Sequence, residues 1–463
     1  MHTATPYNIF RLLVPATGTT PPNAPKIELE GTPWTMTDDM PMFDGNIPEY
    51  TCISYSWGSG RTANPLVPGE MSDRVIPVIE ATIRAVHPAA IWIDAFCIPH
   101  LEPAREACLL SLGALYSSAA QVVAVLSKPC SAFLGDVVRT ASLDEAGLLL
   151  LENDEWAGRA WTYQELVNSK KFCFATEGGS VSRDGQQFLS DVMAALDNYK
   201  KAHRYDTYML RILHPRLDNL EDSIADWRMA NYLERSAYQV MSSMDRRTVE
   251  RPDDVFHAMI GAISAEPLSS RYKTTLHLAE YFMQLCEEKG DFSFIYSSAL
   301  RSNVPGRSWR PLAGPLPAIL PWHTFGDGQS GKLEPSCLRL NNMCRMTRGT
   351  LSSEADEKIN IRLPRHPDDS TSGNGPDRIL ARLRQIGFTG CGNFLELNDG
   401  YFFPQSSNAI TEDVIVIVAA GVEWTHGGPG LITTQDAAGV NHFRDVGVFV
   451  GPVPAYRDSI DLA

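Results

Sequence analysis

The sequence lacks the local signatures of the commonest metal and hydrolase sites. No HExxH or GxSxG motif occurs, no cysteines or histidines have zinc-type spacing, and the eleven histidines are scattered. The nine cysteines are an odd number, form no CxxC pair and lie mostly among apolar residues, a pattern typical of reduced, buried thiols. A metalloenzyme and a serine hydrolase are therefore disfavoured, and we expect no metal site.

Long apolar runs and blocks of like charge are missing too. The start of the chain has no basic segment followed by an apolar run of signal-peptide length, and no stretch of about eighteen apolar residues occurs. We therefore expect a cytoplasmic protein without a membrane span. The formal charge of −15 is spread along the chain, which disfavours nucleic acid as a partner. A phosphate-bearing small molecule remains compatible, because one Arg or a helix N-terminus can supply positive potential.

The 463 residues exceed one average domain, and their composition is that of a globular protein. Over residues 1–179 short β-branched runs alternate with segments of helical period, which predicts an α/β domain with a parallel sheet. Residues 180–300 are predicted to be mainly helical, and 301–463 to form an irregular linker and a small β-rich unit. The predicted strands of the first domain are 50–55, 90–94, 121–127 and 171–175.

Two of these strands end in polar residues that are candidates for ligand binding. Loops beyond the carboxyl ends of parallel strands converge on ligands. The first strand leads into a glycine-containing loop through Ser54, Tyr55, Ser56 and Trp57. The second ends in a lone carboxylate, Asp94, which must be paired if it is buried. Asp94 therefore either orders a neighbouring loop or touches a ligand.

A third segment, EWAGRAWTYQELV, precedes the fourth strand. If it is helical from Gly158, it places Trp161, Glu165 and Asn168 on one face. A glutamate in the middle of a helix is ordinarily a solvated surface residue. The pattern alone therefore assigns no chemistry to Glu165.

Together these segments resemble the fungal heterokaryon-incompatibility (HET) family. The matching motifs, in the family's order and spacing, are ISYSWG at 53–58, WIDAFCIPH at 92–100, LYSSA at 115–119 and WAGRAWTYQE at 156–165. Pro99 and His100 replace the family's usual Asn-Gln, which leaves the role of that loop open. The resemblance implies a protein of fungal non-self recognition and programmed cell death signalling.

HET domains are in turn similar to Toll/interleukin-receptor (TIR) domains, flavodoxin-like folds of which a subset cleave NAD. The corresponding segments here are CISYS at 52–56, VAVLS at 123–127 and WTYQEL at 161–166. This resemblance implies a flavodoxin/TIR-like first domain. It also gives Glu165 the role of the catalytic glutamate, with NAD or a related nucleotide as the small-molecule ligand.

Cleavage of the nicotinamide–ribose bond leaves positive charge on the ribose, which one carboxylate can stabilise. Neither a metal nor a cofactor is required, and the carboxylate should stay ionised, so a raised pKa is not needed. Trp57 or Trp161 would stack on a ring, and Arg159 or backbone N–H groups would hold the phosphates. This hypothesis requires Glu165 to share a cleft with Tyr55 and Trp57.

The alternative belongs to a different class of function. The HET module would then be a non-catalytic interaction domain that signals by self-association or by binding a protein partner. In that interpretation Glu165 and Arg159 form a structural ion pair. The sequence leaves both interpretations open.

Overall fold

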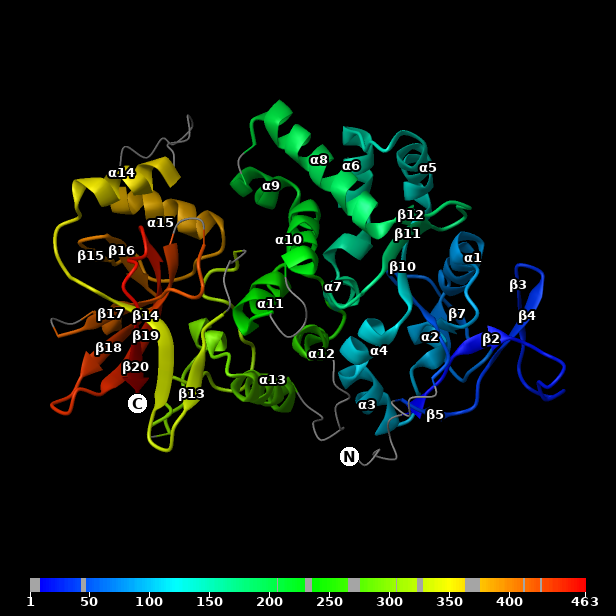
Figure 1. Cartoon of the computed structure of the whole chain (residues 1–463), viewed down its shortest axis with the longest axis horizontal. Helices are drawn as coiled ribbons and strands as arrows, with labels where there is room; N and C mark the ends of the chain where they lie inside the picture. The colour runs from blue at the N-terminus through cyan, green and yellow to red at the C-terminus, as the bar shows by residue number, and fades with distance from the viewer. Residues whose placement is uncertain are drawn as a thin grey trace. The chain divides into compact units, whose positions relative to one another are not determined.

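The computed structural model describes residues 9–42, 47–205, 207–229, 235–264, 275–304, 306–322, 328–362, 375–410, 413–424 and 427–463. The chain forms two compact units (Figure 1). Unit 1 comprises Met1–Leu233 and Arg246–Lys273, and unit 2 comprises Glu234–Asp245 and Thr274–Ala463. The predicted boundaries at residues 179 and 300 do not coincide with this division. The physical reason is that the helices after residue 179 pack on the sheet of unit 1 and complete its core.

Unit 1 is built on an eight-stranded sheet whose four central strands are parallel. The order is β12-β11-β10-β6-β9-β2-β4-β3. The parallel strands are β6 (Thr51–Ser54), β9 (Ile91–Trp92), β10 (Gln121–Leu126) and β11 (Phe172–Thr176). The first three lie within the predicted runs, and β11 extends one residue beyond the predicted run 171–175. The antiparallel edge strands are β2 (Leu13–Pro15), β4 (Thr32–Met36), β3 (Ile27–Leu29) and β12 (Arg183–Asp184).

The chain enters the parallel part of the sheet at β6, adds β9 on one side, and then adds β10 and β11 on the other. Right-handed crossovers in opposite directions place their helices on opposite faces of the sheet. Helix α1 (Val75–Val86) joins β6 to β9, and α3 (Ala104–Leu110) and α4 (Leu112–Ser118) lead to β10 (Figure 1). Both faces are thus covered, and every residue of β11 is buried, as expected for a parallel strand.

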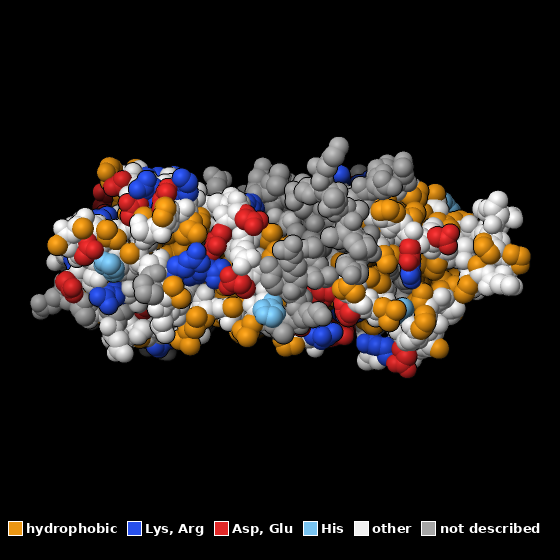
Figure 2. Space-filling view, turned by 90° about the horizontal axis from the view of Figure 1, so that it is seen from below, with side chains coloured by type: hydrophobic (Ala, Val, Ile, Leu, Met, Phe, Trp, Pro, Cys, Tyr) orange, Lys and Arg blue, Asp and Glu red, His pale blue; other side chains and the backbone are white. Residues whose placement is uncertain are grey.

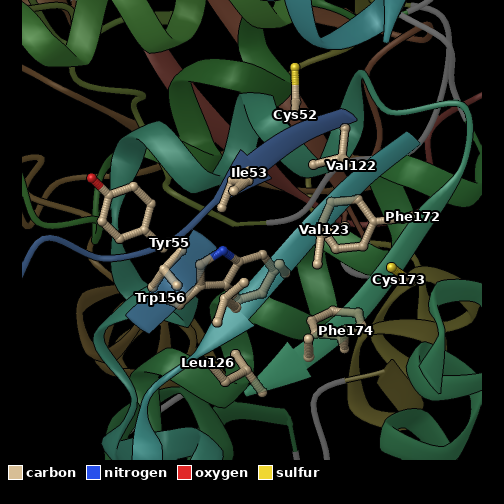
Figure 3. Packing of buried hydrophobic residues seen from close by; sticks show 14 of the residues in the cluster. Cys52, Ile53, Tyr55, Val122, Val123, Leu126, Trp156, Phe172, Cys173 and Phe174 are labelled. Carbon is tan, nitrogen blue, oxygen red and sulfur yellow. The ribbon is translucent and has the colours of Figure 1, made fainter. Parts of the chain in front are cut away.

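The core of unit 1 is dense where β6, β10 and β11 lie side by side (Figure 3). Trp156 packs against Phe172 and Phe174, with ring centroids 6.2 and 5.4 Å apart. Cys52 and Ser54 point to the same face as these rings, because residues paired across the strands share a face. Trp156 therefore lies directly over the end of β6.

The other elements of unit 1 are mostly helices. They are α2 (Asp94–Cys97), α5 (Ser131–Thr140), α6 (Glu145–Asn153), α7 (Ala160–Val167), α8 (Gly185–His203), α9 (Thr207–Leu213), α10 (Pro215–Met229), α12 (Pro252–Ile263) and the 3-10 turns η1 (Lys128–Cys130) and η2 (Glu155–Gly158). Two short ribbons, β1 (Ile9–Phe10) with β5 (Met40–Pro41) and β7 (Arg61–Ala63) with β8 (Glu70–Ser72), complete the unit.

Unit 2 contains a small β-barrel, which agrees with the predicted β-rich C-terminal unit. The strands that close it are β14 (Leu338–Met346), β17 (Ile415–Ala419), β18 (Gly427–Gln435), β19 (Asn441–Val450) and β20 (Asp458–Leu462). Its other elements are α11 (Ala237–Met244), α13 (Thr275–Lys289), η3 (Ser293–Tyr296), β13 (Gly331–Leu333), α14 (Ser353–Arg362), α15 (Gly375–Gln385), β15 (Leu395–Leu397), β16 (Gly400–Pro404) and η4 (Ser407–Ala409). In the described part of the chain, no helix has the length and apolar character needed to cross a membrane.

Candidate functional site

Glu165 lies at the carboxyl end of the first parallel strand. The Ser54 hydroxyl, at the end of β6, donates a hydrogen bond of 2.5 Å to Glu165 Oε2. The same hydroxyl accepts a bond of 2.7 Å from Trp156 Nε1. Side chains from β6, η2 and α7 are thus in contact at the carboxyl end of β6.

The glutamate is buried because its whole helix is buried. Of the eight residues of α7, all except Trp161 are buried, since α4, α10 and α12 pack around the helix. Glu165 itself is only 9% exposed. It is therefore not the solvated surface residue that its mid-helix position ordinarily indicates.

Burial changes the acidity of Glu165. Loss of solvation raises the pKa of its carboxyl from 4.5 to about 7, and the negative charge of Asp94 acts in the same direction. Hydrogen bonds from Ser54 and Tyr116 and the charge of Arg159 oppose this rise. The carboxyl thus exchanges its proton near neutral pH, instead of staying fully ionised as the proposed chemistry assumes.

Asp94 orders the loop after β6. It opens α2, and its carboxylate accepts hydrogen bonds from the Tyr55 hydroxyl (2.9 Å), Trp57 Nε1 (2.6 Å) and the N–H of Ala95 (2.6 Å). Burial raises the pKa of this carboxyl, while the three donors lower it. Tyr55 and Trp57 therefore contact Asp94, and the role of ordering the neighbouring loop is the one that its bonds support.

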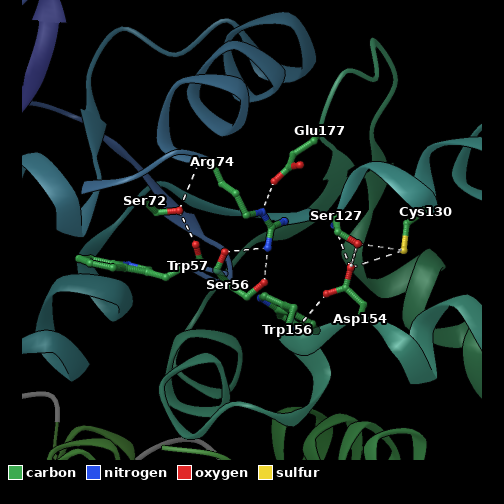
Figure 4. A network of polar contacts seen from close by, with 9 residues as sticks. All are labelled: Ser56, Trp57, Ser72, Arg74, Ser127, Cys130, Asp154, Trp156 and Glu177. Atoms are coloured by element: carbon green, nitrogen blue, oxygen red, sulfur yellow. Dashed lines mark hydrogen bonds and ion pairs between the residues drawn. The ribbon is translucent and has the colours of Figure 1, made fainter. Parts of the chain in front are cut away.

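Ser56 belongs to a second polar network, centred on Arg74 (Figure 4). Arg74 Nη1 donates to the carbonyl of Ser56 (2.7 Å) and to its hydroxyl, and Nε pairs with Glu177. The Ser72 hydroxyl holds the carbonyl of Trp57. Sequence reasoning did not include Arg74, because it lies in no motif and its contacts join segments far apart in the chain.

Arg159 and Trp161 flank the start of α7 and have partners of their own. Arg159 Nη2 forms an ion pair of 3.4 Å with Glu250, so the predicted ion pair between Arg159 and Glu165 is wrong. The ion pair fails because Arg159 precedes the helix while Glu165 faces the sheet. Trp161 stacks on His257 with ring centroids 5.8 Å apart.

Sequence reasoning also missed Tyr116, a partner of Glu165, and Trp156, which donates to the Ser54 hydroxyl. Trp156 is part of the WAGRAW motif but was given no role, and Tyr116 is part of LYSSA. Their positions in these motifs were the available signal. Within the described residues no group of three or more His, Cys, Asp or Glu side chains is arranged to hold a metal ion.

The fold and the site define an α/β protein in which the buried carboxylate of Glu165 and the partly buried carboxylate of Asp94 lie near the carboxyl ends of parallel strands. Residues 50–146 match the model of the family described as "Heterokaryon incompatibility protein (HET)". This segment of the chain is therefore similar to the heterokaryon incompatibility (HET) family. The matched segment includes β6, Asp94 and α4, whereas α7 with Glu165 follows it. No curated protein and no solved structure matches the chain.

Proposed function

We propose that this chain is a HET protein and that it signals in fungal non-self recognition by cleaving NAD at the nicotinamide–ribose bond, with Glu165 as the carboxylate beneath the ribose. The observation that carries the proposal is the position of Glu165, whose carboxylate is bonded to Ser54 at the carboxyl end of β6. In open parallel sheets, ligands bind at this end of the strands. The side chain is also close enough to Tyr55 and Asp94 to affect their charge states.

The topology of unit 1 supports the flavodoxin/TIR-like part of this proposal. In chain order the parallel strands β6, β9, β10 and β11 are first to fourth, and across the sheet they read second, first, third, fourth. That is the strand order of flavodoxin-like folds up to the fourth strand. Such folds bind nucleotides beyond the carboxyl ends of their first and third strands, which are β6 and β10 here.

The chemistry assigns distinct tasks to the residues of the site. The nicotinamide–ribose bond breaks with its electron pair leaving on neutral nicotinamide, and water then adds to the cationic ribose and releases a proton. Ionised Glu165 would stabilise the ribose cation, and Ser54 would orient that carboxylate. Asp94 would act as a positioning residue that fixes Tyr55 and Trp57 beside the substrate.

Trp57 suits the aromatic wall better than Trp161 does. One face of Trp161 is stacked on His257 and one face of Trp57 is covered by Arg61, but Trp57 is also fixed by Asp94 through its ring nitrogen. The charge of Arg159 reaches both carboxylates, because it lowers the pKa of Asp94 and of Glu165. Arg159 would therefore face the same ligand.

The experiment is release of nicotinamide from NAD by the purified full chain, measured by chromatography. Glu165→Gln keeps the size of the side chain and should lower the rate by about 100-fold or more, the scale of losing one transition-state charge partner. Glu152→Gln is the matched control, because Glu152 is a half-buried carboxylate whose bonds go to the backbone N–H groups of Arg216 and Leu217. Equal rates for wild type and Glu165→Gln would remove the catalytic assignment.

A specific observation favours a second candidate function. Glu165 is almost closed off from solvent and is bonded within the core, as a purely structural residue would be. In that case the HET module signals by self-association or by binding a partner, without turnover. Cell death caused by expression of the protein would then persist in Glu165→Gln, and light scattering of the purified protein would report the self-association.

A further inference from the structure

Arg74 lies beyond the carboxyl end of β6, the strand that pairs with β10. It directly precedes α1, and its guanidinium extends to the loop after β6 through Ser56 and to the residue after β11 through Glu177. Figure 4 shows the guanidinium between Ser56 and Ser127, the residue that follows β10. The loop after β6 and the residue after β11 therefore share one cation at the ligand end of the sheet.

The junction of β6 and β10 is the point at which the strand order of the sheet reverses. The chain leaves β6 toward β9 on one side and later returns to add β10 on the other. Ligands of open α/β sheets bind at such a reversal, because the loops on either side of it diverge. Arg74 is thus a partly buried cation, with 15% of its side chain exposed, at the position where the topology favours a ligand.

The guanidinium is incompletely paired. Nε and Nη2 form one edge of the planar group, the edge that holds two oxygens of one anion side by side. Glu177 takes only Nε, and Nη2 is buried without a hydrogen-bond partner. The neighbouring carboxylate Asp154 is already held by Ser127 and by the N–H of Trp156. A buried donor without an acceptor is costly, so this edge lacks one oxygen.

We propose that Arg74 binds a phosphate group of a nucleotide through its Nε and Nη2 atoms, and that Glu177 occupies the place of this phosphate in the unliganded protein. The nucleotide class rests on the proposed NAD function, whereas the anion chemistry rests on the guanidinium alone. Each phosphate of such a dinucleotide has two non-bridging oxygens, which can span both donors, while Glu177 satisfies one. The ligand must therefore displace the Glu177 carboxylate.

This competition makes two substitutions act in opposite directions. Arg74→Gln removes the cation and should weaken binding of the anion. Glu177→Gln removes the competing charge and should tighten it. If the two residues form only a structural ion pair, either substitution would lower the stability of the protein, and neither would tighten anion binding.

The experiment is calorimetric titration of the full chain with ADP-ribose and with inorganic pyrophosphate at low salt. We expect about tenfold weaker binding of both in Arg74→Gln and about fivefold tighter binding in Glu177→Gln. Asp197→Asn on the exposed face of α8 makes the same change in net charge as Glu177→Gln and should leave both affinities unchanged. Arg74→Lys keeps the charge but loses the two-donor edge, and should also bind more weakly.

Several outcomes would overturn the proposal. They are unchanged affinity in folded Arg74→Gln, no gain in Glu177→Gln, or no binding of either probe to wild type and to Glu177→Gln. If Arg74→Gln does not fold, the affinities of Arg74→Lys and Glu177→Gln test the proposal in its place. Glu165→Gln separates this proposal from the proposed function. A chain that cleaves no NAD but binds ADP-ribose through Arg74 refutes the function and keeps the anion site.

Discussion

Replacing Glu165 by glutamine should stabilise the protein at alkaline pH. The fold raises the pKa of this carboxyl from 4.5 to about 7, mainly by burial. Each pKa unit corresponds to about 1.4 kcal/mol, so keeping the group ionised costs the folded state about 3 kcal/mol. Glutamine has the shape of the neutral acid and its carbonyl still accepts the bond from Ser54, so the variant escapes this cost.

The direction with pH follows from proton binding. Between pH 4.5 and about 7 the folded state keeps the Glu165 proton that the unfolded chain has lost. The contribution of the neutral group is fully present below the unfolded pKa and disappears as pH rises through the folded one. Stability of the wild type relative to Glu165→Gln should therefore fall across this window and become constant above it.

The assay is urea unfolding of both proteins at about pH 5 and about pH 8, with the difference in unfolding free energy compared between the two. Because the chain has two compact units, hydrogen exchange at the amides of β6 provides a readout confined to unit 1. The contributions of all other titrating groups to the unfolding free energy cancel in this difference, because the two proteins share those groups. A difference between them that does not change with pH would refute the argument from burial.

Two further predictions concern α7 and the helices that pack against each other beside it. The rate of NAD cleavage should rise with pH through about 7 and then level off, because only ionised Glu165 stabilises the ribose cation; a pH-independent rate would contradict this role. Gly113→Ala should destabilise unit 1 by about 1–3 kcal/mol in urea unfolding, because its Cβ in α4 would lie 2.2 Å from the backbone carbonyl oxygen of Gly261 in α12; unchanged stability would show that α4 and α12 can separate without cost.

The sequence predicted the parallel centre of unit 1, because each strand is a short apolar run that ends in polar residues. The pairing of Ser54 with Glu165 was accessible only through family resemblance, since 111 residues separate the two. Burial of α7 was not predictable from its own pattern. Its polar residues Gln164 and Glu165 read as exposed, and only packing by α4, α10 and α12 places them inside.

Unit 2 shows a similar limit of local patterns. Strands of the small barrel follow from alternating runs, but the short helix α11 joins this unit through a contact distant in sequence. Asp291 accepts the N–H of Ala237 at the start of α11, 54 residues away. A boundary placed by composition at residue 300 cannot find such an exchange of segments, because nothing in the composition of residues 234–245 distinguishes them from their neighbours.

The donors around the two carboxylates explain why Glu165 suits a titrating role better than Asp94 does. Asp94 is bonded by the N–H groups of Trp57 and Ala95, which can only donate, so of its three partners the Tyr55 hydroxyl alone could accept a hydrogen bond from this carboxyl when it is protonated. Glu165 is bonded by the hydroxyls of Ser54 and Tyr116, which can also accept. Glu165 can therefore gain and lose its proton without leaving a buried group unpaired. The same exchangeable hydroxyls would let a ribose hydroxyl take their place.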